Sequence, residues 1–193
     1  MKVTTVIAYT AVNLLLSYAA QGQSSFAFRN LYSVYGVDAP VFDARGVPLA
    51  GSNYLAELWG GATSDSLAPV VDVWQGNRRE IISFVSDGYF SSASASLSVL
   101  TVPPGGWAWL QVRAWDARLG ATYEEVFARG LDGYGESLLF YAQGGTPLGL
   151  PGPPGPLIGL QSFSLREVIP EPNTVWLLLI GLPFLFVRCR RRK

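Results

Sequence analysis

The sequence predicts an all-β fold, an antiparallel β-sandwich of the jelly-roll or immunoglobulin-like kind, and three observations predict it. Short segments of alternating apolar and polar residues, rich in β-branched and aromatic side chains, recur along the middle of the chain. Stretches rich in Gly, Pro and Asp separate them. No amphipathic helical pattern interrupts this series, although residues 52–61 could form a short helix behind a serine cap.

The expected strands follow one another in chain order. They cover residues 26–34, 53–60, 80–86, 106–115, 136–143 and 157–165. The segment 106–115 is the clearest, because small aliphatic residues occupy one face and the other face carries Trp107, Trp109, Gln111, Arg113 and Trp115. We therefore expect a body over residues 23–142, a Gly/Pro-rich crossover with polyproline II character over 143–159, and a last strand within 160–167.

Composition limits the chemistry that the body can perform. The chain has 193 residues, of which 49% are hydrophobic and 15% charged, so one packed domain with accessory segments is expected. It has no histidine, and its single cysteine is Cys189, so a Ser-His triad, a disulfide framework and a Cys/His zinc site are excluded. Between residues 23 and 169 there are eight Arg and 13 acidic residues, a net charge near −5 that disfavours nucleic acid.

The first 22 residues have the layout of a secretory signal peptide. Lys2 forms a minimal positive region, residues 3–16 are mostly apolar, and small residues that suit cleavage follow at 17–22. The alternative is a buried N-terminal helix or strand. A signal peptide would place the body outside the inner membrane.

The last 26 residues carry three features in order. Pro170, Glu171 and Pro172 form a stiff, extended triplet, since proline denies the backbone its helical hydrogen bonds. Residues 174–187 form an uncharged apolar run that would rise only about 21 Å as a helix, short of a hydrocarbon core of about 30 Å. The run is represented by Thr174, Trp176, Leu179, Gly181, Phe184 and Val187. A basic anchor follows, which the positive-inside rule places in the cytoplasm: Arg188, Arg190, Arg191, Arg192 and Lys193.

This combination resembles the PEP-CTERM sorting signal of Gram-negative bacteria. The resemblance covers residues 168–193 and implies a short transmembrane helix that holds the exported chain temporarily in the inner membrane. It further implies recognition and removal of the tail by exosortase, followed by delivery to the cell surface or an exopolysaccharide matrix. An ordinary C-terminal membrane anchor is the alternative.

The body is also similar to uncharacterised exported proteins that carry the same sorting signal. This similarity rests on residues 35–59, on "VRAWDARLGATYEE" at 112–125 and on "LQSFSL" at 160–165. It implies no established activity and therefore no catalytic residues.

Several acidic residues are candidates for catalytic or calcium-binding groups. Glu124 and Glu125 are adjacent, and on a strand they would point to opposite faces, so they cannot share a proton site. Asp116 could meet either of them across a loop as a glycosidase-like pair, with solvated loop charges as the alternative. The stretches 38–43 and 132–136 resemble fragments of calcium loops but lack the ligand spacing of an EF-hand. We expect no catalytic residue, no metal site and no cofactor.

Trp107, Trp109 and Trp115 would lie on one face of the 106–115 strand and could stack on sugar rings. A large aromatic core is the alternative. The sequence thus favours a secreted, non-enzymatic surface or matrix protein, with exosortase and the inner membrane as transient partners. A carbohydrate-binding module for exopolysaccharide and, more weakly, a hydrolase built on carboxylates remain alternatives.

Overall fold

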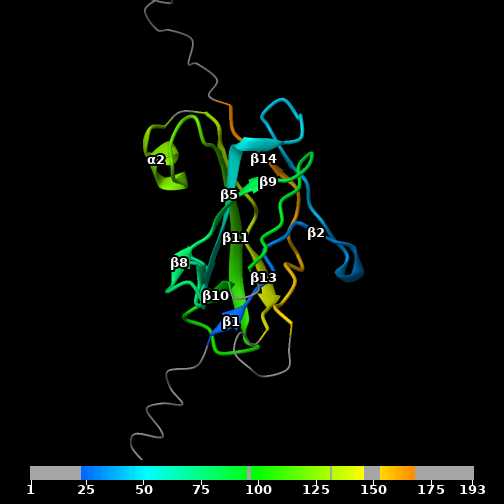
Figure 1. The fold of residues 1–193 in the computed structure, drawn as a ribbon, viewed down its shortest axis with the longest axis vertical. Helices are drawn as coiled ribbons and strands as arrows, with labels where there is room; N and C mark the ends of the chain where they lie inside the picture. Colours follow the sequence, from blue (N-terminus) through cyan, green and yellow to red (C-terminus); the bar gives the residue numbers. More distant parts are fainter. Residues whose placement is uncertain (1–22, 95–96, 131, 146–152, 168–193) are drawn as a thin grey trace, which may run out of the picture.

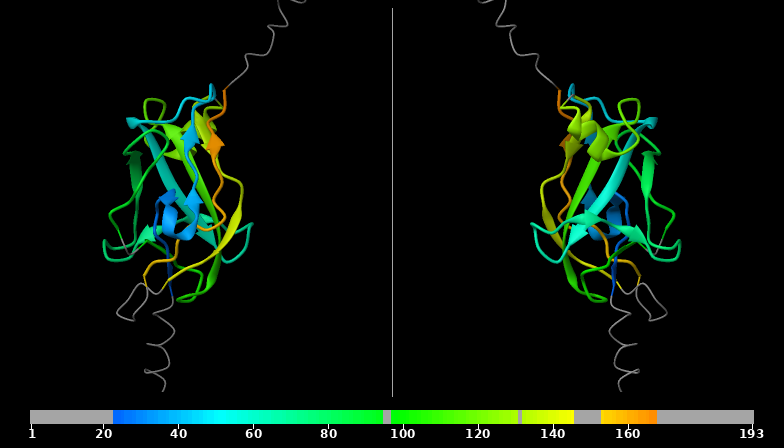
Figure 2. Two further views of the ribbon diagram at one scale, coloured as in Figure 1. Left: turned by 90° about the vertical axis from the view of Figure 1, so that its right-hand side faces the viewer. Right: turned by 90° about the vertical axis from the view of Figure 1, so that its left-hand side faces the viewer.

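A computed structural model describes residues 23–94, 97–130, 132–145 and 153–167, which form a body of short strands with a single short α-helix (Figures 1 and 2). The strands are β1 (Ser24–Ser25), β2 (Leu31–Tyr32), β3 (Val37–Asp38), β4 (Val41–Phe42), β5 (Gly51–Gly61), β6 (Ala68–Pro69), β7 (Val71–Asp72), β8 (Arg78–Arg79), β9 (Ile81–Phe84), β10 (Leu97–Val99), β11 (Trp107–Asp116), β12 (Tyr134–Glu136), β13 (Phe140–Gln143) and β14 (Phe163–Ser164). The helices are the 3-10 turn η1 (Ser33–Tyr35) and α2 (Tyr123–Ala128).

The two long strands β5 and β11 are the centre of a six-stranded antiparallel sheet. They pair in register from Tyr54 opposite Asp116 to Gly61 opposite Trp109. The strand order is β12-β11-β5-β6. In addition, β13 pairs with β11, and β9 pairs with β5. The predicted strands 53–60 and 106–115 are confirmed, because period-two alternation over eight or more residues leaves one face apolar enough to be buried.

The core lies between this sheet and a four-stranded antiparallel sheet of order β1-β10-β7-β8. Ala108, Leu110, Val112 and Ala114 of β11 are fully buried, and they share one hydrophobic cluster with Leu97 and Val99 of β10. The two sheets approach closely at Gly60 of β5. A Cβ atom there would lie 2.6 Å from a Val99 methyl group and 2.9 Å from a Leu110 methyl group. The all-β prediction is therefore confirmed.

β14 departs from the expected antiparallel pattern, because it pairs in parallel with β4, Phe163 opposite Val41. On its other side the chain bonds β12: the Arg166 N–H donates to the Tyr134 carbonyl at 2.7 Å, and the Gly133 N–H donates to the Arg166 carbonyl at 3.0 Å. Leu165, which lies between Ser164 and Arg166 in the chain, is buried in the core. The last strand is thus held from both sides, up to Arg166.

The sequence does not predict the helix α2, because it places Glu124 and Glu125 beside a hairpin-like loop after the strand 106–115; in the structure both lie in the first turn of α2. Thr122 caps the helix by accepting a hydrogen bond from the Glu125 N–H at 3.3 Å, and the Glu125 carboxylate accepts from the Ala121 N–H at 2.8 Å. These bonds satisfy amides that a helix start leaves open. Residues 52–61, conversely, form strand rather than helix.

Three predicted strands form only in part: residues 26–34, residues 136–143, and residues 157–165, of which only Phe163–Ser164 is strand. In residues 26–34 only β2 is regular, and the buried Asn30 side chain binds backbone groups there: its Nδ2 donates to the carbonyls of Ala39 and Gly88, and its Oδ1 accepts from the Phe90 N–H, each at 2.8 Å. Residues 136–143 divide into the end of β12 and β13. Hydrogen bonds from a side chain to the backbone, such as those of Asn30, compete with the backbone hydrogen bonds between paired strands.

The described body begins and ends at opposite ends of its long axis, with β1 at the bottom and β14 near the top of Figure 1. The expected signal peptide (1–22) and the whole sorting signal (168–193) lie outside the described residues. Among the residues that the structure describes, no helix is long and apolar enough to cross a membrane.

Candidate functional site

The outer face of the six-stranded sheet, opposite the core, changes character along β11. At the Asp116 end the helix α2 covers it, in the middle it carries charged residues, and at the Trp107 end it carries exposed aromatic rings. The exposed fraction of the outward tryptophans follows this order: 51% for Trp107, intermediate for Trp109 and 0% for Trp115.

Trp115 cannot stack on a ligand in this structure, so its predicted role is corrected. It forms a second, small core with Tyr123 and Val126 of α2. Its ring meets Tyr123 edge-on at 6.3 Å between centroids, and its indole N–H donates to the Gly120 carbonyl at 3.2 Å. The alternation of β11 predicts the face correctly, but the unpredicted helix is what covers it.

A partly buried ion pair lies in the middle of this face. Glu57 of β5 has no exposed surface, and Arg79 of β8 binds both of its oxygens, from Nε at 2.5 Å and from Nη2 at 2.6 Å. The Trp59 indole N–H donates to the same carboxylate at 2.9 Å. The hydrogen bond to Glu57 raises the pKa of Arg79 above its usual value, against the effect of burial. This fork geometry makes the pair strong and directional.

Arg113 links this pair to the covered end of the face. Its guanidinium lies 3.7 Å from the centroid of the Trp59 ring and 5.0 Å from that of Tyr123, so it is held by cation–π contacts on two sides. The Tyr123 hydroxyl donates to Glu136 at 3.2 Å. Burial, followed by the charge of Glu136, raises the pKa of Tyr123 above its ordinary 10.0. These side chains bind one another, which fits a structural role.

The exposed end of the face is a cluster of three aromatic rings from two paired strands. Trp107 of β11 and Tyr141 of β13 are stacked, with 5.3 Å between centroids and 22° between planes. Trp109 lies 5.1 Å from Tyr141 at 41°. About half of the Trp107 and Tyr141 side chains is exposed, 51% and 49%. We call Trp107, Trp109 and Tyr141 the aromatic platform. Sequence reasoning missed Tyr141, because only the β11–β13 register places it beside the tryptophans.

A surface groove of about 320 Å³ borders the aromatic platform. Its floor is the end of β13, and one wall is the segment 153–156 of the Gly/Pro-rich crossover. The lining residues are Tyr35, Trp107, Tyr141, Ala142, Gln143, Gly144, Pro153, Pro154, Gly155, Pro156 and Ile158. None of them carries a formal charge.

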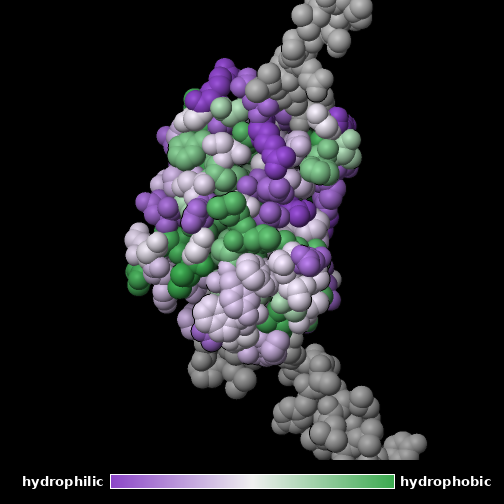
Figure 3. Space-filling model, turned by 180° about the vertical axis from the view of Figure 1, so that it is seen from behind, coloured by the Kyte–Doolittle hydropathy of each residue, from purple (hydrophilic) through white to green (hydrophobic). Residues whose placement is uncertain are grey.

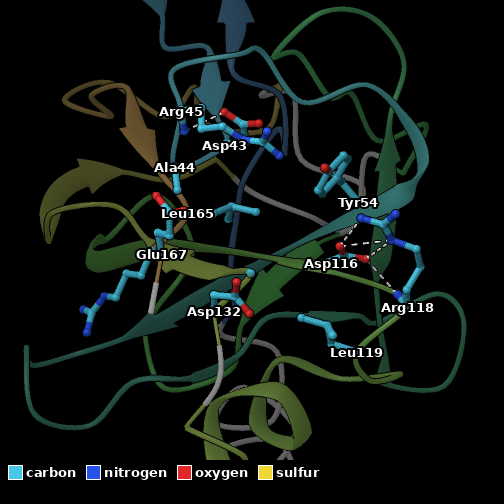
Figure 4. A pocket seen from close by; sticks show the side chains of 12 residues that line it. Asp43, Ala44, Arg45, Tyr54, Asp116, Arg118, Leu119, Asp132, Leu165 and Glu167 are labelled. Carbon is cyan, nitrogen blue, oxygen red and sulfur yellow. Dashed lines mark hydrogen bonds and ion pairs between the residues drawn. The ribbon is translucent and has the colours of Figure 1, made fainter. Parts of the chain in front are cut away.

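A second cavity, of about 330 Å³, lies at the opposite end of the body and is strongly charged (Figure 4). Asp116 faces it and binds Arg118, whose guanidinium donates to both carboxylate oxygens. These hydrogen bonds hold the pKa of Asp116 below its usual 3.8. The segments 35–59, 112–125 and 160–165 all contribute to the lining of this cavity, through Arg45, Asp116 and Leu165 among others. Hydrophilic side chains also gather at this end in Figure 3, while apolar and pale aromatic ones gather lower down.

Each acid of the predicted combinations for which the structure gives a partner binds a different group. Glu124 pairs with Arg79 at 3.0 Å, whereas Asp116 pairs with Arg118. Asp38 accepts from the Tyr89 hydroxyl at 2.8 Å. Asp43 binds the amides of its own turn, a local role typical of aspartate. Within the described ranges, no three His, Cys, Asp or Glu side chains are grouped closely enough to hold a metal ion.

Comparison with protein-family models, with curated proteins and with solved structures found no match to this chain.

Proposed function

We propose that this chain is an exported, non-enzymatic surface or extracellular-matrix protein of a Gram-negative bacterium. Its C-terminal signal holds it in the inner membrane until exosortase removes the tail. The observation that carries the proposal is the ordered combination of Pro170-Glu171-Pro172, a short apolar run and a terminal basic cluster in a chain that begins like a signal peptide. Each feature alone is common, and their order is specific.

The body is proposed to be a β-sandwich, of the jelly-roll or immunoglobulin-like kind. Two antiparallel sheets that share one core support this architecture. A non-enzymatic role is supported by the absence of histidine from the whole sequence and by the arginine partners of Glu57 and Asp116. The carboxylate-based hydrolase has less support, because both oxygens of Glu57 and of Asp116 already accept hydrogen bonds from arginine.

The test is to express the full chain in a host with exosortase and in the same host without it, and to fractionate both. With the enzyme, we expect the protein at the surface and a mass that lacks the residues beyond the Pro170–Pro172 region. Without it, the intact chain should stay in the inner membrane. The variant Glu171→Ala should accumulate uncleaved, whereas the matched variant Glu167→Ala should be processed normally. Surface protein that retains Lys193 in the enzyme-containing host would refute the proposal.

A second candidate function, binding of a polysaccharide by the body, is favoured by one specific observation. Trp107 and Tyr141 stack beside each other on the surface, and about half of each side chain faces solvent. Exposed aromatic clusters of this kind are atypical of an inert surface and mark interaction sites. Trp109 supports the pair from the same strand as Trp107.

A further inference from the structure

We propose that the groove beside the aromatic platform binds an uncharged polysaccharide, with sugar rings packed against Trp107 and Tyr141. The inference rests on the polysaccharide-binding function proposed above and adds the place, the ligand class and the residues. It involves only described residues.

The ring geometry supplies the first argument. Trp107 and Tyr141 are stacked, with 22° between their planes and 5.3 Å between their centroids, so each ring covers one face of the other and its opposite face is the one that a sugar ring can contact. The negative π faces of such rings attract the weakly positive C–H groups on the apolar side of a pyranose ring. Trp109 lies directly opposite Tyr141 on the same face of the sheet and packs against its ring at an angle of 41°. A pair of fixed rings suits a chain of linked sugars better than a single one.

The wall of the groove is rigid, which favours binding because little conformational entropy is lost. Pro153, Pro154 and Pro156 fix their own backbone φ angles. Between them, Gly155 is bonded to the body in both directions: its N–H donates to Ser25 at 2.9 Å, and its carbonyl accepts from Ala27 at 2.8 Å. A Cβ at Gly155 would lie 2.2 Å from the Gln143 carbonyl, so only glycine permits this contact.

The absence of charge in the groove selects the class of ligand. Its lining combines aromatic and proline surfaces with a few neutral polar groups, the hydroxyls of Tyr35 and Tyr141 and the amide of Gln143. The Gln143 Nε2 donates to the Gly105 carbonyl at 3.1 Å, which orients its amide. An acidic polymer would find no cation among the lining residues, whereas hydroxyl groups can bond to all three neutral groups. The ligand is therefore a neutral polysaccharide.

The experiment is a titration of the full-length chain, in mild detergent, with soluble β-glucan, dextran and mannan as neutral polymers and polygalacturonate as an acidic one. Isothermal calorimetry and tryptophan fluorescence report binding. We expect at least one neutral polymer to bind, without weakening between about 50 and about 500 mM salt, since no ion pair is involved. Trp107→Ala and Tyr141→Ala should each lower the affinity about tenfold or more.

The matched control is Trp74→Ala, because Trp74 is 68% exposed and does not line the groove. This variant should bind as the wild type does. Trp107→Phe, which keeps a ring, should lose less affinity than Trp107→Ala, and thermal unfolding of all variants excludes a general loss of structure. If none of the polymers binds, the polysaccharide-binding function fails together with the inference. Two other outcomes would leave the polysaccharide-binding function in place but show that this groove is not its site. One is binding of the acidic polymer alone, and the other is normal binding by Trp107→Ala and Tyr141→Ala.

Discussion

Glu57 and Arg79 form a forked ion pair across the outer face of the large sheet, with oxygen–nitrogen distances of 2.5 and 2.6 Å, and Glu57 is completely buried. The two residues are 22 positions apart in sequence, on β5 and β8, which belong to different sheets. The pair therefore ties the edge of the smaller sheet to the larger one.

Arg79→Ala should lower the free energy of unfolding by about 3 to 5 kcal/mol, because it leaves a buried carboxylate without its cation. Urea unfolding followed by tryptophan fluorescence measures the loss. The neighbouring Arg78→Ala, at an exposed position, should change stability by less than about 0.5 kcal/mol. The double variant Arg79→Ala/Glu57→Leu should recover much of the stability, and a loss equal to or larger than that of Arg79→Ala alone would argue against the buried charge as the cause.

Gly60→Ala should destabilise the body by about 1 to 3 kcal/mol, because the added methyl group would enter the contact between the two sheets. It would lie 2.6 Å from Val99 and 2.9 Å from Leu110 side-chain carbons. Combined with Val99→Ala, the substitution should cost less than the sum of the two single changes, since the second change removes the nearer of the two close contacts. Strict additivity in this double-mutant cycle would show that the sheets do not meet at Gly60.

Asn30→Ala should cost about 3 kcal/mol, because two backbone groups would lose the hydrogen bond to this side chain and a third, the Gly88 carbonyl, would keep only its bond from the Val41 N–H. These are the carbonyls of Ala39 and Gly88 and the N–H of Phe90. Chemical denaturation gives the change, with the exposed Asn53→Ala as control. If both variants unfold at the same denaturant concentration, the three hydrogen bonds do not contribute to stability as described.

Stability should fall in alkaline solution partly through Tyr123. Burial raises the pKa of its hydroxyl in the folded protein above the ordinary 10.0. The stabilisation is therefore fully present below the unfolded pKa and is lost as the pH rises through the folded one. The loss of unfolding free energy from about pH 8 to about pH 11 should be smaller in Tyr123→Phe than in the wild type. The exposed Tyr35→Phe should lose as much as the wild type, and an equal loss in Tyr123→Phe would contradict the assignment.

The sequence predicts the central strands well, because β5 and β11 are long and β11 alternates between buried and more exposed residues over most of its length. Very short strands such as β7 and β8 leave no such signal, since two residues cannot show a period. The parallel pairing of β14 with β4 is likewise invisible in a local pattern. This pairing depends on the path of the Gly/Pro-rich crossover, which brings the chain back beside β4.

The candidate site could be predicted only in part. The pattern of β11 places Trp107, Trp109 and Trp115 on one face, but periodicity does not reveal what covers a face, and α2 buries Trp115. A signal for α2 was present, since Thr122 and Glu125 have the spacing of a capping box. Tyr141 and the Glu57–Arg79 pair depend on register and on contacts between sheets, which single-sequence reasoning does not supply.

The position of β14 has a mechanical consequence. Arg166 is bonded on one side to Tyr134 and Gly133, and Phe163 pairs with Val41 on the other. A pulling force on the chain beyond Glu167 is therefore transmitted to the body through a segment that is hydrogen-bonded on both sides. Several of these hydrogen bonds must break together before the segment separates from the body. Pro170 follows Arg166 by only four residues, a reach of about 14 Å when fully extended. So short a connection keeps Pro170 within that distance of Arg166, the last residue of the chain that is hydrogen-bonded to β12.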